Sequence, residues 1–284
     1  MKRHFFNTGI ILLLAILICS SCNQRPKVKE KPVINSKGQT GTVEVEVFDA
    51  VKLKDQLVEI IKTAPKPNEL VDFINKGGYS YIADLTLSPE NAEKYMTLAE
   101  QSLATGVYKF DLYYAKVYNR YDIVDQIFDV QQKLVTKIGL QSDIASMKKY
   151  NDRIKQNKEN TDSLNIIISA VMNELSQSYL TGEHSGVYAL SYVSANIEGL
   201  YILTQIASMA KDNSELLKLI GQQKERVKTN YMLLEIMAAD AAVAPIFEKM
   251  KPIMDSFSNT QEFSAKQLAE VAPLIEKLRT DIVK

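Results

Sequence analysis

Apolar residues recur every third or fourth position along most of the chain from residue 50 onward, with charged and polar residues between them. This spacing places the apolar residues on one face of an α-helix. Runs of this kind, separated by glycine, proline or polar stretches, predict helices at 51–63, 68–76, 89–105, 107–138, 142–158, 162–181, 187–211, 214–240, 245–258 and 265–283. The pattern therefore predicts an all-α fold, a multi-helix bundle formed by residues 50–284.

Local signals mark where several of these helices begin and end. The Ser-Pro-Glu sequence at 88–90 supplies an N-cap, a proline at the first helical position and a first-turn acid. Ser264 with Gln267 predicts a capping box at the start of the last helix. Glycine just past the end of an apolar run is typical of the residue that ends a helix, and three glycines fit this place: Gly77, Gly139 and Gly182.

The stretches 106–121 and 186–201 are similar to each other. They read GVYKFDLYYAKVYNRY and GVYALSYVSANIEGLY, with the first three residues and the last tyrosine at matching positions. The similarity predicts two copies of a three-helix unit, 89–158 and 162–240, each with a glycine break before its central helix, followed by a C-terminal helical hairpin. Chance similarity between two apolar helices explains the same identities, so both interpretations stay open.

Residues 23–49 lack helical spacing and are rich in lysine, proline, glycine and other polar residues. The piece TVEVEVF at 42–48 alternates like a β-strand, but the sequence offers no second strand to pair with it. We therefore expect residues 22–49 to form a flexible tether in front of the helical domain.

The start of the chain has the three parts of a signal peptide. A positively charged segment is followed by an unbroken apolar run at 10–18 and by two small residues, Ser20 and Ser21, of the kind that precede a cleavage site. The apolar run is much shorter than the roughly 20 residues that span a bilayer. A removed signal peptide at 1–21 is therefore favoured over a permanent transmembrane anchor.

The sequence Cys19-Ser20-Ser21-Cys22 resembles the lipobox of bacterial lipoproteins, in which small residues precede a cysteine that becomes the lipidated first residue of the mature protein. The resemblance implies lipidation of Cys22, and two or more acyl chains hold a protein stably at a membrane. Asn23 follows in place of the Asp associated with inner-membrane retention, which implies the outer membrane, on its periplasmic or its surface face. The alternative is an ordinary secretory signal that leaves Cys22 as a free thiol.

A second resemblance covers most of residues 80–240. The short sequences GVY…DLYY, NTDSLN and IEGLYI are similar to those of a group of helical bacterial lipoproteins whose function is uncharacterised. This resemblance implies a helical fold and an envelope location, and it implies no activity.

Composition excludes several classes of site. The chain has 34 basic and 34 acidic residues, so it lacks the positive charge typical of a protein that binds nucleic acid. After cleavage the remaining cysteine would be Cys22 and the remaining histidine His184, too few for a disulfide framework, a zinc site or a Ser-His-Asp triad. We expect no metal and no cofactor, and we interpret His184 as a solvated turn residue.

One group of polar residues lies on two of the predicted helices. Residues spaced by three and four positions share a helix face, and these faces carry Val107, Asp111, Tyr114, Tyr118 and Tyr121 in the first helix and Val187, Ser191, Ser194, Glu198 and Tyr201 in the second. The second helix is apolar around most of its circumference, which predicts a buried Glu198. A buried carboxylate needs hydrogen-bond donors or a proton. We expect Tyr114 and Tyr118 to pack on Ser191 and Ser194. Their hydroxyls would then donate hydrogen bonds to the carboxylates and fix the register of the two helices.

Three functions are consistent with the sequence. The leading hypothesis is a non-enzymatic, membrane-tethered envelope lipoprotein that serves as an interaction or scaffold module for an unknown envelope protein. The second is a lipoprotein with a polar pocket between the two repeated helices, which would bind a small polar or cationic ligand through Asp111, Tyr114, Tyr118, Asn196, Glu198 and Tyr201. The third is a carboxylate-based hydrolase with Asp111 and Glu198 as its acid–base pair.

Overall fold

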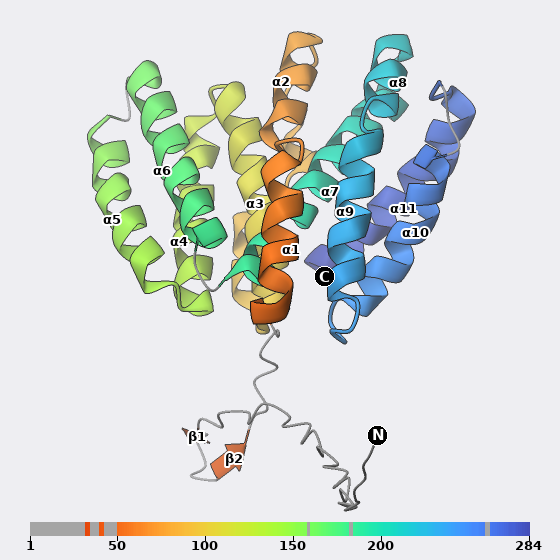
Figure 1. Ribbon diagram of the computed structural model, residues 1–284. Helices are drawn as coiled ribbons and strands as arrows, with labels where there is room; N and C mark the ends of the chain where they lie inside the picture. The colour runs from red at the N-terminus through yellow and green to blue at the C-terminus, as the bar shows by residue number, and fades with distance from the viewer. Residues whose placement is uncertain (1–31, 35–39, 43–49, 158–159, 182–183, 259–261) are drawn as a thin grey trace, which may run out of the picture. The chain divides into compact units, whose positions relative to one another are not determined.

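A computed structural model of the chain describes residues 32–34, 40–42, 50–157, 160–181, 184–258 and 262–284 (Figure 1). The chain divides into two compact units, 1–47 and 48–284. In the first unit, β1 (Pro32–Ile34) and β2 (Thr40–Thr42) form an antiparallel ladder. The tether prediction missed this pairing, because three-residue strands leave almost no alternation to detect. The predicted signal peptide, Cys22 and most of the predicted tether lie outside the described residues.

The described residues of the second unit form helices joined by turns and contain no strand, which confirms the all-α fold class. The elements are α1 (Ala50–Thr63), α2 (Asn68–Lys76), the 3₁₀ helices η1 (Ala83–Leu85) and η2 (Pro89–Lys94), α3 (Leu98–Val117), α4 (Tyr121–Ile138), α5 (Gln141–Gln156), α6 (Thr161–Thr181), α7 (Ser185–Met209), α8 (Ser214–Gly221), α9 (Lys224–Met237), α10 (Ala244–Ser258) and α11 (Ala265–Val283). Within the described ranges, none of these helices combines the length and apolar character that crossing a membrane requires.

The predicted helix break at Gly106 is wrong. α3 continues through this glycine, and the chain turns only after α3 ends, where Asn119 has a positive φ of 58°. Gly106 lies instead where α3 meets α7, and a Cβ atom there would come within 2.0 Å of the Ser191 carbonyl oxygen. A glycine inside a helix costs about 1 kcal/mol relative to alanine. Here the close approach of two backbones requires it.

Helix ends follow the predicted signals in several places. Ser264 and Gln267 form the capping box of α11, and Gly139 ends α4 with a left-handed φ of 85°. The 88–90 segment begins the 3₁₀ helix η2 rather than an α-helix, and α3 starts later at a capping box of its own. One long predicted helix is divided into α8 and α9. Gly182 lies outside the described residues.

The two-copy arrangement of helices is not confirmed. Gly106 lies well inside α3, whereas its counterpart Gly186 is the second residue of α7. The similar stretches therefore occupy different positions in their two helices, and a shared three-helix unit does not follow from them.

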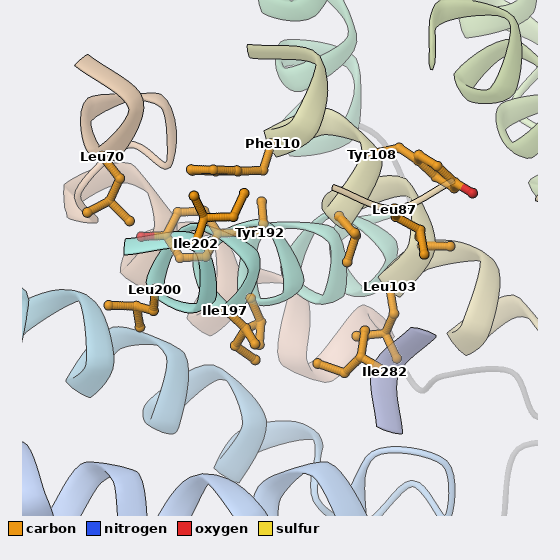
Figure 2. Packing of buried hydrophobic residues seen from close by; sticks show 14 of the residues in the cluster. Leu70, Leu87, Leu103, Tyr108, Phe110, Tyr192, Ile197, Leu200, Ile202 and Ile282 are labelled. Carbon is orange, nitrogen blue, oxygen red and sulfur yellow. The ribbon is translucent and has the colours of Figure 1, made fainter. Parts of the chain in front are cut away.

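α7 is the central helix of the second unit. Its residues from Ser185 to Ala207 are buried almost without interruption, and it packs on α1, α2, α3, α6, α8, α9 and α11. Its most extensive contact is with α3. Figure 2 shows Leu70 of α2, Phe110 of α3 and Ile282 of α11 gathered around α7. The sequence explains this position, because a helix that is apolar around most of its circumference can be buried on every side.

Candidate functional site

The sequence-predicted site residues lie in separate clusters around α3 and α7. We name three clusters by their main members: the core ion pair (Glu198 and Arg279, with Asp111 beside them), the tyrosine cluster (Tyr81, Tyr114 and Tyr118) and the arginine network (Arg226, Asn196 and Asn230). The six residues proposed for one pocket are divided among these clusters by their hydrogen bonds, although the charge of Asp111 also acts on Tyr114 and Tyr201.

The core ion pair joins α7 to α11. The Nε and Nη2 atoms of Arg279 donate hydrogen bonds of 2.9 Å each to the two carboxylate oxygens of Glu198. Glu198 is fully buried, and the Arg279 side chain is 14% exposed. The guanidinium also lies 4.9 Å from the centre of the Tyr201 ring, a cation–π distance. The prediction that Glu198 lies in the core is confirmed, but its partner is an arginine and not a tyrosine hydroxyl.

Asp111 lies close enough to the core ion pair for the charges of Glu198 and Arg279 to shift its pKa. Its Oδ2 atom accepts a 2.9 Å hydrogen bond from the Leu87 backbone N–H, while its buried Oδ1 atom has no partner among the described residues. Burial and the negative charge of Glu198 hold the pKa of Asp111 well above its usual range. One guanidinium balances one carboxylate, so this arrangement favours a proton on Asp111.

Burial and pairing act in opposite directions on the other two groups. Burial raises the pKa of Glu198, and the hydrogen bonds and charge of Arg279 pull that pKa back down. Burial would lower the pKa of Arg279, but Glu198 raises it above its usual value. A bidentate arginine–carboxylate contact is the strong form of an ion pair. The charged pair is therefore the state that holds α11 against α7.

The tyrosine cluster holds the segment between α2 and η1. The Tyr114 hydroxyl accepts a 3.1 Å hydrogen bond from the Ile82 backbone N–H. The Tyr118 hydroxyl donates to the Tyr79 carbonyl. The Tyr81 ring packs on both tyrosines, with its centre 4.8 Å from that of Tyr114 and 5.9 Å from that of Tyr118. The predicted bonds from these hydroxyls to the carboxylates are wrong, because the hydroxyls bind backbone groups instead.

Other members of the predicted helix faces are also placed differently. Ser191 and Ser194 lie against Gly106 of α3, so they pack on a glycine where tyrosines were expected. Tyr121 begins α4 and does not continue the face of α3. His184 is exposed at the start of α7, as the sequence predicted.

Asn196 belongs to the arginine network between α7 and α9. Its side-chain oxygen accepts a 2.7 Å hydrogen bond from Arg226 Nη1, and its amide nitrogen donates to Asn230 at 3.0 Å. Arg226 is 2% exposed and donates further to the Pro65 carbonyl and to the Gln223 side chain. Burial lowers the pKa of Arg226. The fold thus uses the donors of this guanidinium to join helices that lie far apart in the sequence.

Sequence reasoning missed Arg226 of the arginine network and Arg279 of the core ion pair. Arg279 carries a weak signal, because it lies beside Leu278 and between Ile275 and Ile282, all on the buried side of α11. An arginine at such a place must find partners once its helix is packed.

Four surface pockets in the described part of the chain are lined by other residues, and neither Asp111 nor Glu198 lines any of these four. One of them, with a volume of about 270 Å³, is polar and lies between α2, α3 and α6. The described residues hold no group of three or more His, Cys, Asp or Glu side chains placed to bind a metal ion.

No protein-family model matches the chain, and no curated protein or solved structure is significantly similar to it.

Proposed function

We propose that this chain is a lipid-anchored module of the bacterial cell envelope, which is held at the outer membrane through Cys22 and binds another envelope protein through its helical body without catalysing a reaction. The observation that carries the proposal is the sequence that ends at Cys22. A charged start, a short apolar run and two small residues precede this cysteine in the order that lipoprotein processing requires.

The distribution of buried charge supports a binding role over a hydrolytic one. A carboxylate-based hydrolase needs substrate between its two carboxyl groups. Asp111 and Glu198 are fully buried, and both oxygens of Glu198 already accept hydrogen bonds from Arg279. A substrate could reach them only if α11 left α7.

A ligand site made by the six residues of the sequence hypothesis has less support than the scaffold role. The Tyr114 and Tyr118 hydroxyls bind backbone groups of residues 79–82, and Asn196 binds Arg226. Each polar group is therefore used to fix a helix or a connecting segment.

The anchor is tested by labelling cells with an alkyne fatty acid and separating their membranes. Wild type and a Cys19→Ser variant should both carry the label and sediment with the outer membrane, because Cys19 is removed with the signal peptide in the proposed processing. Cys22→Ser should lose the label. Label retained by Cys22→Ser, or an unlabelled wild type in the soluble fraction, would refute the anchor.

The binding role is tested by cross-linking in intact cells. The anchored protein should cross-link to at least one defined envelope protein. The control keeps residues 1–49 and replaces the helical body by an unrelated soluble domain, and it should lose that cross-link. A cross-linking pattern equal to that of the control would show that the body binds no envelope protein.

A further inference from the structure

The polar pocket between α2, α3 and α6 differs from the core clusters because its polar groups face open space. Its described walls come from three helices and from the turn before α2, and Figure 1 shows α3 between α2 and α6. The volume of about 270 Å³ is near the lower end of the range for ligand pockets, roughly 300–1,000 Å³. This size suits a molecule as small as a free amino acid.

Lys116 of α3 is one of the charged residues that line this pocket. It is partly buried, and its Nζ atom donates a 2.8 Å hydrogen bond to the Ser169 hydroxyl of α6. Burial lowers the pKa of Lys116, and the negative charge of Asp72 acts in the opposite direction. An ammonium group has three donors, so the bond to Ser169 leaves others for a bound carboxylate.

The other charged residues that line the pocket with Lys116 are of opposite sign. Lys66 lines the pocket from the turn before α2, and Asp72 lines it from α2 itself. The two lysines would attract a carboxylate group, and Asp72 would attract an ammonium group. A molecule with both charges can satisfy both sides at once.

Neutral hydrogen-bonding groups complete the lining. The side-chain amides of Asn68 and Asn173 and the hydroxyl of Tyr113 belong to residues that line the same pocket. Amides and hydroxyls can both donate and accept, so they can bind the polar parts of a small ligand regardless of its charge.

We propose that this pocket binds a small zwitterion, a free amino acid or a molecule of similar size with one carboxylate and one ammonium group. The carboxylate is bound by Lys116 and Lys66, and the ammonium group is bound by Asp72. This site is separate from the core ion pair, and it adds ligand binding to the proposed role as an envelope module.

The test uses the full-length protein purified from membranes in detergent. Each of the twenty common amino acids is added at millimolar concentration, and the melting temperature is measured, because a ligand that binds the native state raises it. At least one amino acid should raise the melting temperature. Its N-acetyl derivative, which keeps only the carboxylate, and its methyl ester, which keeps only the ammonium group, should each raise it much less.

Variants then locate the site. Lys116→Met keeps the length of the side chain and removes its charge, so it should weaken binding by about tenfold or more, the loss expected for one charge-assisted hydrogen bond. Asp72→Asn, at an exposed position, should act in the same direction. Lys148→Met on the exposed face of α5 is the matched control and should leave binding unchanged.

Three results would overturn the proposal. In the first, none of the twenty amino acids raises the melting temperature. In the second, the N-acetyl derivative or the methyl ester binds as well as the parent amino acid, so that one charge is enough. In the third, Lys116→Met and Asp72→Asn bind as tightly as Lys148→Met, which would place the ligand elsewhere on the protein.

Discussion

Replacing Arg279 by methionine tests whether the core ion pair holds α11 in place. The substitution keeps a long apolar side chain and removes both donors to Glu198, which is fully buried. Removing one partner of a buried ion pair leaves an uncompensated charge, and this typically costs about 3–5 kcal/mol. We expect the free energy of unfolding of Arg279→Met to fall by about this amount at neutral pH.

The loss is measured by urea unfolding, followed by the helical circular dichroism signal. The urea m-value of a domain of this size is about 3 kcal/mol per M, so the midpoint should fall by about 1–2 M. The matched control is Lys251→Met, which removes the lysine of an exposed ion pair with Glu248 on α10. Exposed pairs of this kind contribute little, so the control should unfold at nearly the wild-type midpoint.

The loss in Arg279→Met should also depend on pH. Arg279 lowers the pKa of Glu198 in the wild type, whereas burial raises it. Without the arginine, the folded-state pKa of Glu198 lies further above its unfolded value. The native state then binds the extra proton, so the variant loses stability as the pH rises and regains part of it as the pH falls.

Two results would refute this account of the pair. A midpoint for Arg279→Met within the error of the control would mean that α11 does not depend on the pair. A loss that is as large at low pH as at neutral pH would mean that the cost comes from packing and not from the stranded carboxylate.

Three further variants test other parts of the structure by the same urea assay. Gly106→Ala would place a Cβ atom 2.0 Å from the Ser191 carbonyl oxygen, so it should cost about 3 kcal/mol or more, and a neutral effect would refute the close contact of α3 and α7. Because the folded-state pKa of Asp111 is raised, the wild type should lose stability as the pH rises above the unfolded pKa of an aspartate, about 4. Asp111→Asn cannot ionise and should show a flatter profile. Tyr114→Phe removes the acceptor of the Ile82 N–H and should cost about 1–2 kcal/mol, whereas an unchanged midpoint would mean that water replaces the hydroxyl.

Much of the fold could be predicted because helix formation depends on local signals. Periodic apolar residues located the helices. The Ser264 capping box begins α11 and the left-handed Gly139 ends α4, both where expected. The burial of Glu198 could be predicted for the same reason, because an apolar surface around the whole of α7 leaves no solvent-facing side.

Other features depend on which helices meet, and the local pattern of residues along one sequence does not reveal these contacts. Gly106 was predicted to break a helix. Its lack of a Cβ atom instead allows close contact with α7, about 80 residues further along the chain. Arg279, the partner of Glu198, is equally distant, so a face analysis of α3 and α7 could not find it. Tyr114 and Tyr118 were predicted to donate hydrogen bonds to the buried carboxylates, because the position of the segment at 79–82 could not be predicted. Their hydroxyls bind the backbone of that segment.

The central claim of the proposed function is that Cys22 anchors the protein in the envelope. Its most direct test is the mass of the N-terminal peptide of the protein purified from outer membranes. We predict a peptide that begins at Cys22 and carries the added mass of two or more acyl chains. A peptide that begins at another residue, or one with an unmodified Cys22, would contradict the claim.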